Sequence, residues 1–528
     1  MRRNHVGRAV AWCGVAALVV ALVLAGCAGG AKQPAPEAEK PARDTIVVAL
    51  AREGETLDHI RTSWTTDAHY TVLDRLVERD YDLKYTPHLA ESWTSSPDGK
   101  VWTFKLRKDV KFHDGTPFNA AAVKWFFEAL LDPKNASPSA SDYAFISRIE
   151  TPDEYTVAFH LKDPYPNILF KLSTTYAGII SPEAYRKYGP DGSNEYGTKQ
   201  MVGTGLYRFV EWVPGDHLLV TANPDHQWGP EFVQNKGPAH IKNIKYRIIP
   251  DAATRLMEFE AGNVDLLLEV APQDVERVSK LPNVEVFRKP HFGLGYLAFA
   301  TDKKPFNNVK VRQAINLAID REAIVKSVFF GVASPAYGYL PPLLPEYVED
   351  RQAHRYDPEA ARKLLAEAGY PNGFKCNLAT LNKTEHVRVA EAVQAALAKI
   401  GIQTEITQYD NASYAAFLKE GKQELFIREY SWSSADILQW FLYGSQFPYP
   451  NHSRWVDKKT DELIDAAEYA PSMEAREQGY KALQEYLISK AVWCPIWFPE
   501  KVQAVRTDKV ANFRMHPLYT IFNDVTLK

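Results

Sequence analysis

Strand-like and helix-like segments alternate through the chain after residue 44, and this alternation restricts the possible folds more than any other feature. Runs of β-branched and aromatic residues predict strands at 45–51, 155–161, 205–212, 217–222 and 244–249, and a hairpin at 89–110. Because short connections separate the strands from helices, we expect α/β lobes whose sheets are mostly covered. The chain has 528 residues, several times the usual span of one hydrophobic core, so at least two lobes are predicted.

Two of the predicted helices carry recognisable capping residues. Asp320 can cap a helix that begins at Arg321. Asp357 can cap another, with Pro358 at its first position and Gly369 just beyond its end. Apolar periodicity predicts two further helices, at 387–400 and 473–489.

The first 26 residues have the layout of a secretory signal peptide. Three arginines without an acidic residue precede residues 9–26, which contain no charged side chain. A transmembrane helix is the alternative, because 18 uncharged residues are near the minimum length for a span. The segment ends in Leu-Ala-Gly-Cys27, which resembles the lipobox of bacterial lipoproteins. We therefore expect cleavage after residue 26, a lipid on Cys27 that anchors an extracytoplasmic protein to a membrane, and a flexible tether over 27–43.

Charge and cysteine content exclude several classes of protein. The 62 basic and 65 acidic residues nearly balance, without the basic excess of a nucleic-acid-binding protein. Four cysteines are too few for a disulfide scaffold, and Cys376 and Cys494 are expected either to pair or to stay buried as free thiols. No phosphate-binding loop, nucleophile elbow or paired-histidine motif occurs, so we predict no catalytic residue, no metal site and no cofactor.

The segment over 425–455 stands out by its density of aromatic residues. It contains nine aromatics in 31 residues, where the overall content of 12% predicts about four. Small ligands are bound in aromatic-lined clefts that carry a few polar groups. Asp436 lies four residues after Trp432, and Arg428 shortly before it. Most of these aromatics are expected to fill a core, whereas Trp432 and Asp436 fit a pocket and a core or surface position equally well.

Several segments together resemble the peptide/nickel family of ABC-transporter substrate-binding proteins, solute-binding family 5. They include FHDGTPFNAAAVKW, GTGLYRFVEW and VRQAINLAIDREAIVK, and the resemblance continues in consistent order over residues 44–510. It implies a two-lobed α/β fold of the periplasmic-binding-protein type, with an extra subdomain at about 75–200. It also implies a first lobe over 44–290 plus 496–528, a second lobe over 291–495, and a hinge of two crossing segments.

In peptide-binding members of that family, an acidic residue after a tryptophan meets the peptide ammonium. The nearest counterpart here is Trp432-Ser-Ser-Ala-Asp436, which lacks the second Asp and the Pro of the family pattern. The resemblance implies a monomeric receptor that closes its lobes around di- or oligopeptides and delivers them to an ABC permease with its ATPase. The candidate ligand-binding residues are Trp432, Asp436, Tyr430, Tyr296, Ser433 and Arg428.

Other ligands and other classes of protein stay open at this point. The same receptor role is compatible with nickel or a metallophore, haem or an oligosaccharide. An exported hydrolase is an alternative without a nucleophile motif in its support. A surface adhesin or chaperone-like protein would use the same cleft for extended chains.

Overall fold

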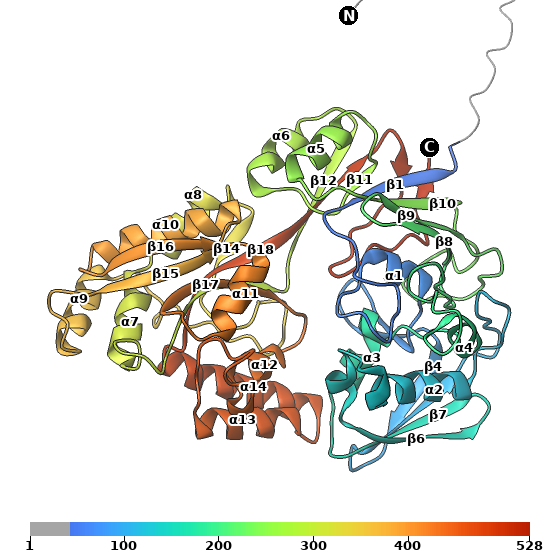
Figure 1. Cartoon of the computed structure of the whole chain (residues 1–528), viewed down its shortest axis with the longest axis horizontal. Helices are drawn as coiled ribbons and strands as arrows, with labels where there is room; N and C mark the ends of the chain where they lie inside the picture. Colours follow the sequence, from blue (N-terminus) through green and yellow to red (C-terminus); the bar gives the residue numbers. More distant parts are fainter. Residues whose placement is uncertain (1–42) are drawn as a thin grey trace, which may run out of the picture. The chain divides into compact units, whose positions relative to one another are not determined.

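One long strand, β18 (Trp493–Arg506), belongs to both halves of the largest sheet in the computed structural model, which describes residues 43–528 (Figure 1). Its first half pairs with β13 (Gly293–Phe299) and β14 (Ala333–Pro335). Its second half pairs with β11 (Leu266–Leu267) and β12 (Val284–Pro290). The sheet therefore continues from one half to the other in the order β16-β15-β17-β13-β18-β11-β1-β10-β9-β8.

Two extended segments connect the halves. Strand β12 leads into β13 through only residues 291–292, and β18 runs back alongside both strands in the antiparallel direction. Figure 1 shows the two halves as separate groups of helices and strands on either side of this crossing. The fold is thus a two-lobed α/β structure with two crossing segments as its hinge, and residues Arg43–Lys528 make up one unit.

The first lobe contains a mixed sheet and a smaller antiparallel sheet. In the mixed sheet, β1 is parallel to β10 and β11, while β8 and β9 extend the edge as an antiparallel hairpin. The smaller sheet has the order β4-β5-β7-β6 and carries α2 on one face, which gives the lobe its extra subdomain. Both sheets contribute to one apolar core. The strands of this lobe not given above are β1 (Thr45–Leu50), β2 (Val77–Arg79), β3 (Tyr85–Pro87), β4 (Ala90–Ser95), β5 (Val101–Leu106), β6 (Ile146–Asp153), β7 (Thr156–Leu161), β8 (Tyr207–Val213), β9 (His217–Ala222), β10 (Asn243–Ile248), β19 (Val510–Ala511) and β20 (Thr526–Leu527).

The helices of the first lobe are short. They are α1 (Asp67–Val72), α2 (Ala120–Leu131), α3 (Ile168–Ser173), α4 (Pro182–Tyr188), α5 (Ala252–Glu260) and α6 (Val275–Ser279). Helix α3 is only six residues long, and Figure 1 shows it on the side of the lobe that faces α12 and α14 of the second lobe. Its position there brings one buried lysine, Lys171, to the junction of the lobes.

The second lobe has helices on both faces of its sheet. Strands β15 (Lys375–Leu381), β16 (Gln403–Tyr409) and β17 (Leu425–Ser431) join β13 in this sheet. Alternate residues of β17 point into two different apolar clusters, Leu425 and Ile427 into one and Phe426 and Tyr430 into the other. The first cluster lies under α7 (Val309–Ala318), α8 (Arg321–Val328), α9 (Pro358–Glu367) and α10 (Thr384–Ala398), and the second under α11 (Asn411–Lys419), α12 (Ile437–Leu442), α13 (Lys458–Glu468) and α14 (Met473–Ser489).

The local sequence predictions are largely confirmed. Asp320 accepts a hydrogen bond from the backbone N–H of Ala323, and Asp357 one from that of Ala360, as expected of N-caps. The helix after Asp320 begins at Arg321, as predicted, and ends at Val328. The predicted strands and the hairpin are present with small shifts of their ends, and α14 has the predicted bounds.

The structure decides between the two predictions for the cysteines, whereas most of the predicted N-terminal segment lies outside the described residues. Cys376 and Cys494 are both buried and free, which decides between the two possibilities left open above. Arg43, the last residue of the predicted tether, donates to the buried carboxylate of Asp265. The predicted signal peptide and Cys27 lie outside the described residues. Among the helices of residues 43–528, none combines the length and apolar character needed to cross a bilayer.

Candidate functional site

The segment between β17 and α12, residues 432–436, touches the first lobe through most of its side chains. Its backbone is held beside the hinge, because the N–H of Trp432 donates to the carbonyl of Phe292. We call residues 432–436 the junction segment. Its predicted binding residues therefore lie where the two lobes meet.

Three polar contacts and one aromatic contact connect the junction segment to the first lobe. Ser433 accepts a hydrogen bond from Arg79 Nη2 at 3.1 Å, and Ser434 accepts one from Asn167 Nδ2 at 3.3 Å. The carboxylate of Asp436 pairs with the ammonium of Lys171 at 3.0 Å. The Trp432 ring packs edge-on against Phe170, with 5.7 Å between the ring centroids.

Asp436 is saturated by partners within the chain. Its Oδ2 faces Lys171, and its Oδ1 accepts a hydrogen bond from the indole N–H of Trp432 at 2.6 Å. Only 3% of its side chain is exposed. Burial alone would raise the pKa of Asp436, but the attraction of Lys171 and Arg476 outweighs it and holds the pKa below its usual value. Asp436 therefore remains a carboxylate although it has almost no contact with solvent.

Lys171 is equally buried and carries a second carboxylate contact. Its Nζ lies 2.8 Å from Asp142 Oδ1, on the 3-10 turn Ala140–Tyr143 of the same lobe. Burial would lower the pKa of Lys171, and the attraction of Asp436, Tyr165 and Asp142 outweighs burial, so the pKa lies well above its usual value. The ammonium is thus shared between one acid from each lobe.

A second buried cation supports the junction segment from inside the second lobe. Arg476 on α14 is 1% exposed and donates to Glu346 Oε1 at 2.5 Å, Glu468 Oε1 at 3.3 Å and Ser434 Oγ at 3.3 Å. Glu468 also accepts from the hydroxyl of Tyr480. Burial raises the pKa of Glu468. Arg476 therefore fixes both a pair of buried acids and one serine of the junction segment.

Two of the predicted binding residues belong to the core of the second lobe. Tyr296 is 2% exposed and packs against Trp493 with its ring tilted by 32° and 4.4 Å between the ring centroids. Tyr430 is 6% exposed, and its hydroxyl donates to the carbonyl of Tyr339 at 2.6 Å. Both side chains belong to one apolar cluster on the same face of the sheet.

Arg428 lies on the same face of β17 but is only half-buried. Its guanidinium carbon lies 5.9 Å from the Phe441 ring centroid. Within residues 43–528 its Nε has no hydrogen-bond partner. The structure thus brings Trp432, Ser433 and Asp436 together at the junction and places Arg428 next to Phe441 of α12, within the second lobe.

Sequence reasoning missed the first-lobe side of the junction. These residues are Arg79, Asn167, Phe170 and Lys171. The available signal was one lysine inside the apolar run Ile-Leu-Phe-Lys-Leu of α3, because a lysine in such a run is rarely buried without a carboxylate partner. That signal identifies Lys171 but not its partner.

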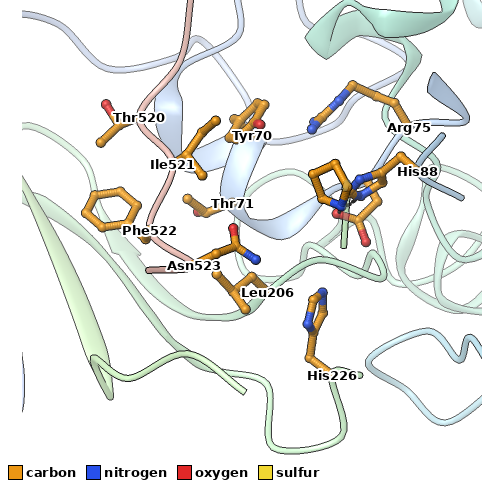
Figure 2. A pocket seen from close by; sticks show the side chains of 12 residues that line it. Tyr70, Thr71, Arg75, His88, Leu206, His226, Thr520, Ile521, Phe522 and Asn523 are labelled. Carbon is orange, nitrogen blue, oxygen red and sulfur yellow. Dashed lines mark ion pairs between the residues drawn. The ribbon is translucent and has the colours of Figure 1, made fainter. Parts of the chain in front are cut away.

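The two described cavities are separate from the junction segment. A cavity of about 30 Å³ in the first lobe has room for about one or two water molecules. Its lining includes Tyr70, Arg75, His88 and His226 (Figure 2). The carboxylate of Asp74 beside it accepts a hydrogen bond from the indole N–H of Trp228 and contacts the ring of His88. A second cavity of about 320 Å³ lies in the other lobe, and none of the six predicted residues lines either one. Within residues 43–528, no three His, Cys, Asp or Glu side chains gather closely enough to hold a metal ion.

Two α/β lobes, joined by two crossing strands and meeting at a polar junction, define a binding protein of the two-lobed, hinge-closing class. A family model for bacterial extracellular solute-binding proteins, family 5, matches residues 84–449. The chain therefore belongs to family 5 of the bacterial extracellular solute-binding proteins.

Individual relatives agree with this assignment. The glutathione-binding protein GsiB of Escherichia coli K12 is 32% identical over 524 residues, 97% of each chain. The haem-binding protein A of Haemophilus influenzae is 33% identical over 451 residues, 80% of this chain and 81% of its own. The structure of the ABC transporter-associated periplasmic binding protein DppA of Helicobacter pylori, in complex with the peptide STSA, superposes with a TM-score of 0.76 at 28% identity, over 92% of this chain and 98% of that chain.

Proposed function

We propose that this protein is the extracytoplasmic receptor of an ABC importer, capturing di- or oligopeptides by closure of its two lobes and delivering them to the membrane permease. The observation that carries the proposal is similarity over nearly the full length to a glutathione-binding protein, whose ligand is itself a small peptide. The likeness to a peptide-bound DppA supports the same ligand class. A solute stabilises the closed state only by binding it more tightly than the open state.

The proposed lobes are 44–290 plus 496–528 and 291–495, with the extra subdomain at about 75–200. The short connection between β12 and β13 supports the first boundary, and the passage of β18 through both halves of the sheet supports the second. The small sheet between Ala90 and Leu161 supports the subdomain. We propose a monomer, since both lobes are contained in one chain.

We further propose that residues 1–26 are removed on export and that Cys27 is lipidated, with 27–43 as the tether. The uncharged run and the Leu-Ala-Gly-Cys27 sequence support this. A tether of this kind keeps the receptor at a high effective concentration near its transporter. Mass spectrometry of the N-terminal peptide from membranes tests it: the expected mass carries two acyl chains on Cys27, and an unmodified Cys27 contradicts it.

The proposed solute contacts are Trp432, Ser433 and Arg428, together with Asp436 through the Lys171 ammonium that its carboxylate holds. The location of Trp432, Ser433 and Asp436 at the junction of the lobes supports the first part of this set, and the position of Arg428 beside Phe441 of α12, the helix that follows the junction segment, supports the last. For Tyr296 and Tyr430, the close packing against Trp493 and the bond to Tyr339 favour a packing role that shapes the second lobe.

Calorimetry and thermal melting with defined probes test the proposed ligand class. The probes are trialanine, reduced glutathione, haemin and the nickel–histidine complex. At 100 times its Kd a ligand stabilises the folded state by about 2.7 kcal/mol, and for a unit of this size that raises Tm by about 3 °C. We expect this shift from a peptide probe. Binding of haemin or the nickel complex alone would refute the peptide assignment and keep the receptor role.

A matched pair of tryptophan variants tests the position of the site. Trp432→Ala removes the ring next to Phe170 and should weaken peptide binding at least tenfold. Trp440→Ala removes an exposed ring eight residues further along the chain and should leave the affinity unchanged. Equal affinities in both variants would show that the junction segment does not contact the solute.

A further inference from the structure

We propose that the ammonium of Lys171 fills a cation subsite at the junction of the two lobes, so that the solute of this protein carries no cationic group at this position. The inference rests on the proposed receptor function and specifies its ligand. Because the chain supplies its own ammonium to Asp436, the favoured peptides are those whose end at this subsite is acylated, or otherwise uncharged or anionic.

The groups around Lys171 form a complete ammonium site. Its Nζ lies 3.0 Å from Asp436 Oδ2 and 2.8 Å from Asp142 Oδ1. The same atom lies 5.6 Å from the Trp432 ring centroid and 5.8 Å from that of Phe170. Two carboxylates and two aromatic rings are the partners that a primary ammonium prefers in a protein.

The subsite is assembled from both lobes and is closed to solvent. Asp142 and Phe170 belong to the first lobe, and Trp432 and Asp436 to the second. The Lys171 side chain is 6% exposed and that of Asp436 is 3% exposed. A solute group that is to pair with Asp436 in this arrangement must therefore displace Lys171.

Displacement is electrostatically unfavourable because the carboxylates of Asp436 and Asp142 are already paired with Lys171. Within residues 43–528, Lys171 is the one cation within 4 Å of Asp436. The neighbouring Arg476 is engaged with Glu346 and Glu468. A second ammonium would face Lys171 at short range, and a displaced Lys171 would lose both carboxylates without leaving the interior. Lys171 thus selects against a free amino terminus at this place.

Removal of the lysine side chain tests the subsite directly. Lys171→Ala keeps Asp142, Asp436 and both rings and leaves a space for a small ammonium. We expect the variant to melt several degrees below wild type. Millimolar n-butylammonium chloride should restore at least half of that loss in Tm, and tetramethylammonium chloride is the ionic control. Lys105→Ala, at an exposed lysine paired with Asp153, should show neither effect. Equal melting of Lys171→Ala and wild type, or recovery that is the same in both salts, would overturn the proposal.

A pair of peptides tests the consequence for specificity without relying on the variant. Trialanine and N-acetyl-trialanine differ in the terminal ammonium and share the carboxylate. Wild type should bind the acetylated peptide at least as tightly as the free one, and Lys171→Ala should shift the ratio at least tenfold towards the free peptide. A wild-type preference of tenfold or more for free trialanine would overturn the inference. If wild type binds neither peptide, the proposed function fails, and the butylammonium experiment still decides whether Lys171 fills an ammonium site.

Discussion

Replacement of Arg476 by methionine should destabilise the protein far more than the loss of an exposed arginine. The guanidinium is 1% exposed and is the partner of two buried acids, Glu346 and Glu468. Arg476→Met keeps an unbranched chain of similar length but leaves both acids without their cation. The variant therefore measures how strongly the second lobe's side of the junction depends on this one charge.

The magnitude follows from the burial of the cluster. Breaking a buried ion pair by removing one partner costs about 3–5 kcal/mol, because the remaining charge stays desolvated. For a unit of this size the entropy of unfolding is about 1 kcal/mol per K, so Tm should fall by about 3–5 °C. The loss should also depend on pH. Burial already raises the pKa of Glu468, and without Arg476 this pKa rises further. The difference in the free energy of unfolding between wild type and variant is therefore largest near pH 8, and it shrinks towards pH 5 as the buried acid protonates.

Urea denaturation of wild type and variant at the two pH values is the assay. Arg277→Met is a matched control, because Arg277 also faces two carboxylates, Glu260 at 3.4 Å and Asp274 at 3.6 Å, but is 55% exposed. Exposed pairs contribute about 0–1 kcal/mol, so the control should stay within that range. A loss below about 1 kcal/mol in Arg476→Met, or an equal loss at pH 5 and pH 8, would refute the reasoning.

Three further outcomes are expected. Gly295→Ala would place a Cβ 2.0 Å from the buried Trp497 ring, so overpacking should cost about 1–3 kcal/mol in chemical denaturation, and unchanged stability would contradict the tight packing at the hinge. Neither Cys376 nor Cys494 should react with iodoacetamide near pH 8 in the native state, because burial raises the pKa of the two thiols to about 12 and about 11; mass spectrometry should find both alkylated only after denaturation. Burial lowers the pKa values of His59, His69 and His113 to about 3, about 4 and about 4. The stability measured by calorimetry should therefore fall as the pH drops from 6.5 towards 4, because these histidines bind protons in the unfolded state and stay neutral in the folded state. A stability that does not change with pH in this range would contradict the low pKa values.

Local features of the fold could be predicted because their causes are local. Asp357 and Pro358 begin α9 for reasons contained in four neighbouring residues, and the 89–110 hairpin follows from its turn. Strand β18 could not be recognised as central in the same way. Pro495 and Pro499 interrupt it, and proline lacks the N–H that a central strand donates, so the pattern argues against its actual position.

In the candidate site, the second-lobe side could be predicted from the sequence and the first-lobe side could not. The aromatic density over 425–455 and the acid after Trp432 identify the second-lobe side of the junction. The opposite side depends on pairs such as Asn167 and Ser434, which are 267 positions apart in the chain. Only the folded topology brings such residues together, and for that reason the partner of Asp436 was not foreseeable from the sequence.

The position of β18 near the end of the chain has a consequence for biosynthesis. Strands β11 and β12 on one side, and β13 and β14 on the other, all use β18 as a neighbour. Until Trp493 and the residues after it have emerged, these strands have unpaired edges, which readily join strands of other chains. The nascent protein thus stays prone to aggregation until almost its whole length has been made, and a single late strand then closes both halves together.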